Sequence, residues 1–339
     1  MSESVLTVEQ LYVEYRSGLG TIQALQDVSL EIERGEVLGV VGESGCGKST
    51  LGLALLGLLP PNARVQSGSI RLGSTELVGL DESALRALRG KELSVVFQDP
   101  MSSLNPTISV GKQLTDIIKA HGRATERGTR QQLRQRVIDA LDRVGIPDPE
   151  VRLHQYPHQF SGGMRQRIMI AMALILEPSL VIADEPTSAL DVTLASQILQ
   201  LLEELRMQFG TSVLLVTHDF GIVSEVCDRA VVMYAGEIVE RSPVDELFAD
   251  PLHPYSEALL QAIPSKDHRG TDLPTIPGRV PPLSALPLGC NFQDRCNYAQ
   301  NVCTEKNPHE IWKSQRAVRC YIHDPGADFD HEGIGRSDD

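Results

Sequence analysis

The residues between positions 39 and 50 combine glycines, a lysine and hydroxyl side chains directly after an apolar run. Residues 42–49 read GESGCGKS and match the phosphate-binding pattern GxxxxGK[ST] at every required position. Glycines let backbone N–H groups curl around an anion, while Lys48 would neutralise the β- and γ-phosphates and Ser49 would ligate Mg²⁺. The sequence therefore predicts a nucleoside triphosphate site. Its contacts are expected from Gly42, Ser44, Gly45, Cys46, Gly47, Lys48, Ser49 and Thr50.

Carboxylate, amide and imidazole side chains stand at the ends of three further apolar runs, 93–97, 179–183 and 213–216. Asp184 ends the second run and would reach the Mg²⁺ shell, while Glu185 would polarise the attacking water as general base. Gln98 would touch the metal or the water, and His218 would hydrogen-bond the γ-phosphate. We therefore expect Glu185, His218 and Gln98 to be catalytic, and Ser49, Gln98 and Asp184 to hold Mg²⁺.

These side chains need a framework that places them at one edge of a sheet. Alternating apolar strands and helices from residue 37 to 235 predict a mostly parallel sheet with its ligands at the carboxyl ends of the strands. Two alternating patterns, 6–15 and 22–32, predict an opening antiparallel hairpin. Tyr15, which ends the first of these strands, would stack on an adenine or be an ordinary strand tyrosine.

A second anion site is expected near residue 161. The amphipathic patterns at 110–120 and 130–144 predict a helical insertion, which ends in the sequence Phe-Ser-Gly-Gly-Met at 160–164. Ser161, Gly162 and Gly163 then begin a helix, and a helix N-terminus binds anions through its free N–H groups. If the insertion projects outward, this helix cannot reach the phosphate-binding loop of its own chain.

Composition excludes several classes of protein. The 339 residues are 41% hydrophobic, as in a folded globular protein, and carry a net charge of −14, which argues against non-specific nucleic-acid binding. The longest apolar run, 168–176, is about half a membrane span, and the acidic start MSESVLTVEQ is not a signal peptide. We expect a cytosolic chain that can sit on a membrane partner.

Four of the six cysteines fall in the last fifth of the chain, with the spacing C-x5-C-x6-C-x16-C. Paired C-x2-C spacings, which are typical of zinc ribbons, do not occur among them. Four soft ligands in a proline-rich segment suit a [4Fe–4S] cluster or a Zn²⁺ ion, and unligated thiols are the third reading. The ligands would be Cys290, Cys296, Cys303 and Cys320.

Taken in order, these signals resemble the ATP-binding subunit of an ABC transporter over roughly residues 5–325. Tyr15 matches the A-loop, Gln98 the Q-loop, residues 160–164 the signature, Asp184 and Glu185 the Walker B motif, Ser188 to Asp191 the D-loop and His218 the switch histidine. The signature departs from the common LSGGQ at Phe160 and Met164. The resemblance implies an α/β fold, the P-loop NTPase ABC cassette, with a RecA-like core sheet, an antiparallel β subdomain and a helical subdomain.

The resemblance also implies partners. Two ABC cassettes pair head to tail, so Ser161, Gly162, Gly163 and Asp191 would act on the ATP of the other cassette. Residues 96–106, 160–167 and 253–260 look like the dipeptide/oligopeptide/nickel importers. Within these, Met164 and the run 168–174 look like the D-type subunit, which pairs with a different F-type subunit. Residues 277–296 resemble the C-terminal extension, which carries an iron–sulfur cluster in some members.

We therefore expect an ATPase subunit that powers import of di- and oligopeptides from the cytoplasmic face of the plasma membrane, as a peripheral protein. Its partners would be an F-type ATP-binding subunit, two transmembrane permeases and an extracytoplasmic binding protein, with no nucleic acid. The ATP-binding domain would span residues 1–250, with a helical subdomain at about 105–178. A loop-rich cysteine extension would follow at 251–325, and a disordered tail at 326–339.

Other readings remain. The same importer class could carry nickel, glutathione or an oligosaccharide. A soluble ABC ATPase is less favoured, because repair proteins insert long coiled coils between the P-loop and Walker B, and translation proteins carry two cassettes. A P-loop GTPase is disfavoured because the chain contains no [NT]KxD stretch to read guanine.

Overall fold

The computed structural model describes residues 4–18, 20–99, 103–121, 129–188, 190–263 and 275–331, without the side chains of Val192 and Leu205. Ala189 of the expected D-loop and residues 332–339 of the expected tail lie outside this range. The chain forms two compact units, and each is described by itself. The first comprises Met1–Thr7, Glu31–Val37 and Arg71–Val216, and the second Val8–Leu30, Leu38–Ile70 and Thr217–Asp339.

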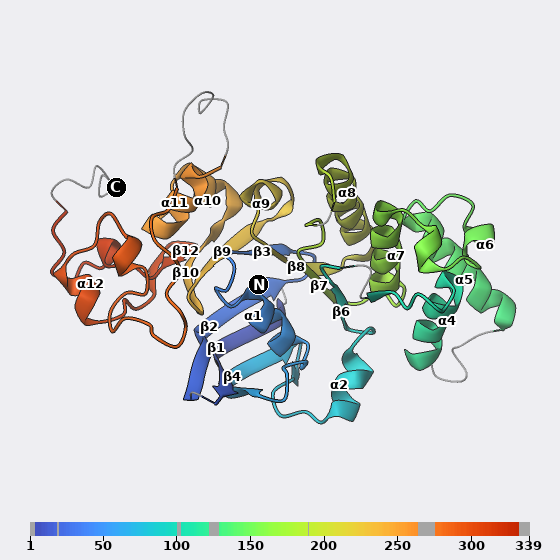
Figure 1. Ribbon diagram of the computed structural model, residues 1–339, viewed down its shortest axis with the longest axis horizontal. Coiled ribbons are helices and arrows are strands. Elements are labelled where there is room, and N and C mark those ends of the chain that lie inside the picture. Colours follow the sequence, from blue (N-terminus) through green and yellow to red (C-terminus); the bar gives the residue numbers. More distant parts are fainter. Residues whose placement is uncertain are drawn as a thin grey trace. The chain divides into compact units, whose positions relative to one another are not determined.

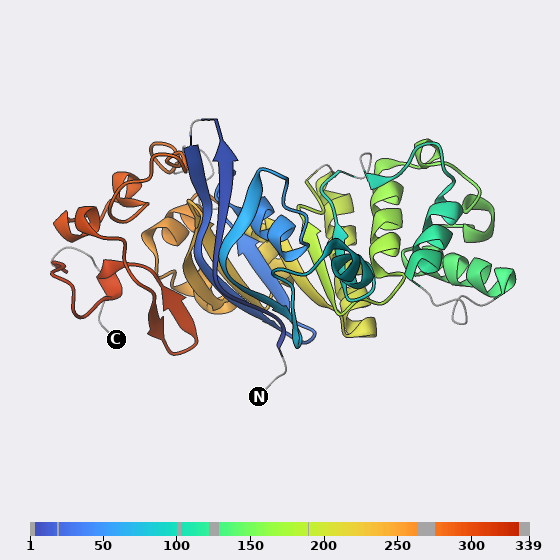
Figure 2. The ribbon, with the colours of Figure 1, turned by 90° about the horizontal axis from the view of Figure 1, so that it is seen from below.

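The chain opens with the two long strands that the alternating pattern predicts. Strands β1 (Ser4–Ser17) and β2 (Gly20–Glu33) are neighbours in a four-stranded sheet of order β2-β1-β4-β5, and run side by side in Figure 2. The other two strands are β4 (Ala63–Leu72) and β5 (Thr75–Glu76). A Cβ at Gly68 would collide with the carbonyl oxygen of Gln10, so β4 approaches β1 where only glycine fits.

The first unit has a sheet of parallel strands, as the alternation of elements predicts. Strand β7 (Leu180–Asp184) lies between β6 (Leu93–Val96) and β8 (Ser212–Thr217), and most of their residues are buried. Val96 pairs with Ala183, so β6 and β7 end at the same edge of this sheet. Helices α2 (Glu82–Leu88) and α8 (Val192–Phe209) belong to the same unit.

The predicted helical insertion is present in the first unit. Its elements are α4 (Val110–His121), α5 (Arg130–Arg143), α6 (Pro149–Arg152), the 3₁₀ turn η1 (Pro157–Gln159) and α7 (Gly162–Leu174). Figure 1 shows α4, α5 and α7 packed together. Apolar residues of these helices, such as Leu114 and Val137, are buried. Helix α5 begins at a capping box, in which Thr129 and Gln132 satisfy each other's backbone N–H groups.

Strand β3 (Val37–Val41) leads directly into the glycine-rich turn, and its residues Leu38–Val41 belong to the second unit. Strand β9 (Arg229–Tyr234) is parallel to β3, and β10 (Glu237–Pro243) is antiparallel to β9. The helices of this unit are α1 (Lys48–Leu55), α9 (Phe220–Val226), α10 (Val244–Ala249), α11 (Pro254–Gln261) and α12 (Asn301–Glu305), with 3₁₀ turns η3 (Gln293–Arg295) and η4 (Tyr321–His323).

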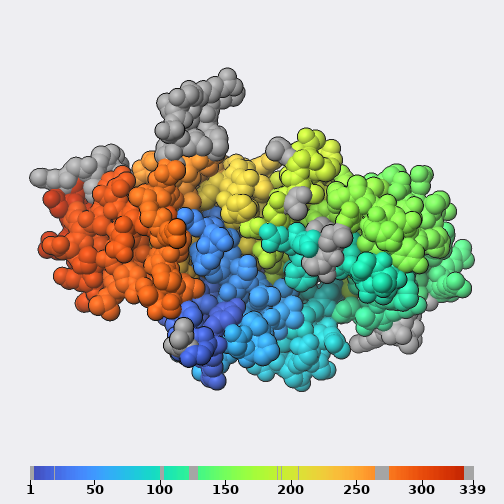
Figure 3. Space-filling view, viewed as in Figure 1, coloured from blue at the N-terminus to red at the C-terminus, as the bar shows by residue number. Residues whose placement is uncertain are grey.

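The segment after residue 251 holds more regular structure than the loops that its prolines predict. Strand β12 (Arg316–Val318) pairs with β10, and β11 (Ile311–Lys313) pairs with β12, so this segment extends the sheet of the second unit. In Figure 3 these C-terminal residues, in orange and red, form one continuous surface. Within the described ranges of the chain, no helix has the length and apolar character needed to cross a bilayer.

A buried carboxylate joins the strand β10 to the segment that follows it. Glu240 is fully buried and accepts hydrogen bonds from the backbone N–H groups of Leu252 and His253, both at 2.8 Å. Arg316 of β12 lies 3.5 Å from the same carboxylate. Burial raises the pKa of Glu240, while these hydrogen bonds and the arginine oppose that shift.

We expect Arg316→Met to lower the free energy of unfolding by about 3 kcal/mol, because Glu240 would stay buried without its cation. Chemical denaturation of the purified chain measures this loss. Lys112→Met is the matched control, since the ion pair of Lys112 with Asp116 is exposed and should be worth less than about 1 kcal/mol. Equal losses in the two variants would contradict the role given to Glu240.

Candidate nucleotide-binding site

The glycine-rich turn connects β3 to α1 in the second unit, as the motif predicts. Gly42, Gly45 and Gly47 have φ angles of 154°, 84° and 111°, a region that favours glycine. A Cβ at Gly42 would collide with the carbonyl oxygen of Met233 in β9, and one at Gly47 would lie 2.9 Å from Leu25. Side chains are therefore excluded from the turn by its conformation and by the backbone behind it.

The turn closes around the amino group of Lys48. This side chain is buried, and its Nζ donates to the carbonyl oxygens of Gly42 at 2.6 Å and Glu43 at 3.1 Å. Ser49, in the first turn of α1, is exposed. A cation held inside a ring of backbone and a hydroxyl at a helix N-terminus are the groups that a triphosphate with Mg²⁺ requires, so these residues fit that ligand.

The thiol of Cys46 lies inside the turn and is fully buried. Burial raises its pKa, against the influence of the nearby Lys48 ammonium. Its backbone carbonyl accepts the N–H of Gly236, which ties the turn to the β9–β10 hairpin. The side chain therefore packs the turn from within, while Ser44 and Gly45 beside it are exposed.

Tyr15, a residue of strand β1, lies beside the first turn of helix α1. Its hydroxyl is 3.5 Å from Oγ1 of Thr50, and its side chain is half-buried at the end of β1. A partly exposed ring beside a phosphate-binding turn is suitably placed to stack on a base. That stacking stays a prediction.

His218 is held at the end of β8 by its neighbours. Asp219 donates its N–H to Oγ1 of Thr217 at 3.0 Å, and its carboxylate accepts the N–H of Gly221 at 2.8 Å, which caps α9. His218 itself is exposed. Its hydrogen bond to a γ-phosphate stays a prediction.

In the first unit, two of the expected catalytic side chains lie together. Nε2 of Gln98 donates to Oε2 of Glu185 at 2.9 Å, because β6 and β7 end at the same edge of the sheet. Glu185 has a φ of 45°, an uncommon left-handed conformation for a residue of this kind. Its N–H donates to the carbonyl of Val216 at 2.8 Å, which holds that conformation. Asp184 is the last residue of β7 and is half-buried.

Gln166 makes a buried contact that the sequence did not predict. It lies in α7, is 1% exposed, and donates from Nε2 to the carbonyl oxygen of Pro186 at 2.6 Å. It therefore connects the helix that follows the signature to the segment that follows Glu185. Arg165 and Arg167 flank it, so no signal in the sequence separates Gln166 from the ordinary polar start of a helix.

The signature and D-loop residues have structural roles of their own. Ser161 caps α7 by accepting the N–H of Met164 at 3.3 Å, and Asp191 caps α8 by accepting the N–H of Leu194 at 3.0 Å. Gly163 is buried, and a Cβ there would lie 3.1 Å from Leu194. Ser161 and Gly162 are exposed at the N-terminus of α7. Their action on the ATP of a second cassette stays a prediction.

The four C-terminal cysteines line one small cavity in the second unit. No cysteine of the chain forms a disulfide, and the open space is about 10 Å³, enough for roughly one water. Burial raises the pKa of Cys296 to about 11 and that of Cys290 to about 12. Among the residues the structure describes, no three or more His, Cys, Asp or Glu side chains are arranged to hold a metal ion. Four thiols that line one cavity are a donor set that suits a soft metal.

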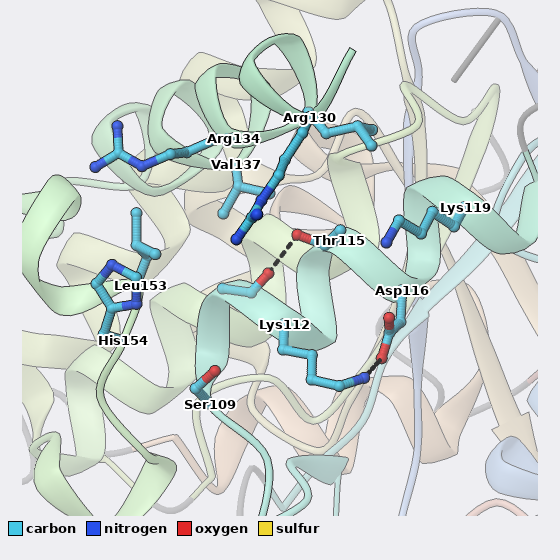
Figure 4. Close-up of a pocket in the computed structure, with 12 residues that line it drawn as sticks. Ser109, Lys112, Thr115, Asp116, Lys119, Arg130, Arg134, Val137, Leu153 and His154 are labelled. Atoms are coloured by element: carbon cyan, nitrogen blue, oxygen red, sulfur yellow. Dashed lines mark hydrogen bonds and ion pairs between the residues drawn. The ribbon is translucent and has the colours of Figure 1, made fainter. Parts of the chain in front are cut away.

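A larger cavity of about 590 Å³ lies among α4, α5 and the segment after α6 (Figure 4). Thr115 donates to the carbonyl of Gly111 at 2.6 Å in its wall, and Lys112 pairs with Asp116 at 2.6 Å. In a chain with a net charge of −14, this cavity is lined by four cationic side chains. They are Lys112, Lys119, Arg130 and Arg134.

Two family models match different parts of the chain. Residues 25–188 match the ABC transporter family, and residues 239–303 match the C-terminal region of oligopeptide/dipeptide transporters. Among solved structures, the ATP-binding cassette MJ0796 in its dimeric form with ADP and Pi has a TM-score of 0.63 and 27% identity over 70% of this chain and 98% of its own. The cbiO1 protein of Clostridium perfringens has a TM-score of 0.62 and 32% identity over 73% and 92%.

Curated relatives are similar over almost the whole length. The dipeptide transport ATP-binding protein DppD of Bacillus subtilis is 45% identical over 96% of this chain and 97% of its own. The oligopeptide transport ATP-binding protein OppD of Salmonella typhimurium is 44% identical over 94% and 93%. The chain belongs to the D-type ATP-binding subunits of the dipeptide/oligopeptide ABC importer family.

Proposed function

We propose that this chain hydrolyses ATP to power the import of di- and oligopeptides through a membrane ABC transporter. The observation that carries this proposal is the presence on one chain of an ABC cassette and an oligopeptide-transporter C-terminal region. Relatives similar over almost the whole length are named for dipeptide and oligopeptide transport. No observation favours nickel, glutathione or an oligosaccharide as cargo.

We assign to the site residues the roles that their counterparts have in ABC cassettes. The P-loop and Lys48 bind the phosphates, and Tyr15 stacks on the adenine. Ser49, Asp184 and Gln98 belong to the Mg²⁺ shell, which neutralises phosphate charge. Glu185 orients the attacking water as general base, and the hydrogen bond from Gln98 directs its carboxylate. His218 contacts the γ-phosphate.

A second cassette completes the site. Ser161 and Gly162 are exposed at the N-terminus of α7, where free N–H groups and the helix dipole favour an anion. We assign this helix to the ATP of a partner subunit, with Gly163 and Asp191 supporting it. The partner would be an F-type chain rather than a second copy. MJ0796, which has the same fold, is dimeric in its ADP- and Pi-bound structure.

The remaining partners are two permeases and an extracytoplasmic binding protein, which place the chain at the cytoplasmic face of the plasma membrane as a peripheral subunit. The cationic cavity between α4 and α5 is a suitable contact for an acidic segment of a permease. Its positive side chains would attract such a segment, and Leu133, Val137 and Leu153 offer it apolar contacts.

We expect Lys119→Glu combined with Arg134→Glu to reduce co-purification of the chain with its permeases about tenfold, because both changes place negative charge in the cavity. Quantitative affinity purification from the host measures the effect. Arg136→Glu is the control, since Arg136 is exposed on α5 but does not line the cavity. Equal loss in the double variant and in the Arg136→Glu control would reject the cavity as the contact.

For the proposed activity, we expect Glu185→Gln to abolish uptake of labelled di- and oligopeptides in the native host, with a fall in ATP turnover of at least about 100-fold. The amide cannot accept a proton from water. Glu177→Gln, which alters only an exposed ion pair, should leave uptake unchanged. Unchanged peptide uptake in Glu185→Gln, or loss of only Ni²⁺, glutathione or oligosaccharide uptake, would contradict peptide import.

We also propose that Cys290, Cys296, Cys303 and Cys320 hold an inorganic centre, with a [4Fe–4S] cluster first and Zn²⁺ second. Four thiols around one cavity, none of them in a disulfide, support a thiolate-ligated centre. A bound cluster would give this segment a covalent crosslink between distant residues.

Anaerobically purified protein should be brown and contain about four irons per chain. Elemental analysis distinguishes the two metals, and replacing Cys303 with serine should remove the metal while Cys227→Ser keeps it. Colourless protein with one zinc per chain would contradict the [4Fe–4S] cluster and assign the four cysteines to Zn²⁺. Protein with neither metal would reject both.

A further inference from the structure

Glu43, the second residue of the P-loop, is bound through each of its polar groups. Its carbonyl oxygen accepts Nζ of Lys48 at 3.1 Å and the N–H of Cys46 at 3.3 Å. Its N–H donates to the hydroxyl of Tyr255 at 2.9 Å, and its carboxylate pairs with Arg295. The last two partners lie more than 200 positions along the chain, in α11 and η3.

The contact of Glu43 with Arg295 is a two-point ion pair. Nη1 lies 2.6 Å from Oε2 and Nη2 lies 3.0 Å from Oε1 of the carboxylate. Paired charge-assisted bonds of this kind fix the relative orientation of both groups as well as their distance. The arginine side chain is 3% exposed and the glutamate side chain 31%, so water screens this pair less than a surface pair.

Arg295 is itself held from several sides. Its Nε donates to the carbonyl oxygen of Pro277 at 2.8 Å, and its guanidinium lies over the rings of Tyr234 and Phe292, at 5.8 and 5.9 Å from their centres. Tyr255, fully buried, packs edge-on against Tyr234 at 4.6 Å between ring centres. The two groups that hold Glu43 therefore come from one rigid aromatic cluster.

Movement of Glu43 would disturb phosphate binding directly. The carbonyl oxygen of Glu43 is an acceptor for the Lys48 ammonium, and Glu43 lies between Gly42 and Ser44 of the phosphate-binding turn. An arginine guanidinium keeps its positive charge throughout the physiological pH range, so replacing Arg295 by a neutral residue would leave the Glu43 carboxylate without its two-point partner.

We propose that Arg295 is a positioning residue for the P-loop, and that the C-terminal segment thereby sets the affinity of the chain for ATP. This inference rests on the proposed ATP-binding function. Arg295 does not touch the nucleotide; it acts through Glu43 on the turn that holds Lys48. Since Cys296 follows Arg295 and lines the cysteine cavity, the same short segment carries both the P-loop contact and a wall of that cavity.

A matched control exists in the same C-terminal segment. Arg319 pairs with Asp27 of β2 at 2.6 Å, with side chains 10% and 32% exposed. This pair also joins the C-terminal segment to the N-terminal part of the second unit, but Asp27 lies outside the P-loop. Arg319→Met should therefore reproduce the loss of a half-buried ion pair without displacing Glu43.

The test uses the full-length purified chain with a fluorescent ATP analogue and Mg²⁺. We expect Arg295→Met to raise the Kd for the nucleotide about tenfold, a typical size for coupling between sites, and Arg295→Lys to raise it less. Arg319→Met should lower the melting temperature without nucleotide as much as Arg295→Met does, yet keep the wild-type Kd.

A double-mutant cycle with Glu43→Gln separates positioning from a general loss of stability. If Arg295 acts through Glu43, adding Arg295→Met to Glu43→Gln should change the Kd less than it does in the wild type. If Arg295→Met does not fold, Arg295→Lys and Glu43→Gln carry the comparison. An unchanged Kd in the Arg295 variants, or an equal change in Arg319→Met, would overturn the inference. Failure of the wild type to bind ATP would instead reject the proposed function.

Discussion

The site depends on the absence of space for a side chain at Gly42. The carbonyl oxygen of Met233, in β9, lies directly behind this glycine, and the turn can close around Lys48 only because its backbone comes so near to that strand. The parallel pairing of β3 with β9 fixes this distance. A steric constraint between two strands that are almost 200 residues apart thus shapes the phosphate-binding turn.

The features that the sequence predicts correctly are those that depend on residues close to one another in the chain. The P-loop pattern, the ends of the apolar strands and the helix that begins after Ser161 depend on neighbours within a few positions, and the structure has each of them. The pairing of Gln98 with Glu185 also follows, since both come directly after strands that end at one edge of a parallel sheet. The helical insertion was visible as amphipathic periodicity.

Contacts between distant residues could not be derived in the same way. Gln166 reads as part of the start of an ordinary helix, and nothing near it in sequence shows that its amide meets Pro186. The prolines after residue 251 predict loops, but β12 pairs with β10, and its Arg316 lies 3.5 Å from the buried Glu240, a contact between residues that are far apart in sequence. Glu43 matches a position where the motif allows any residue, so its pairing with Arg295 becomes visible only in the fold.

We expect the chain to bind ATP at the turn between β3 and α1, and calorimetric titration of the purified chain with ATP and Mg²⁺ measures this binding. One nucleotide should bind per chain, ADP should compete with it, and Lys48→Ala should lose binding while it keeps the fold. Absence of binding in the wild type, or undiminished binding in Lys48→Ala, would contradict this expectation.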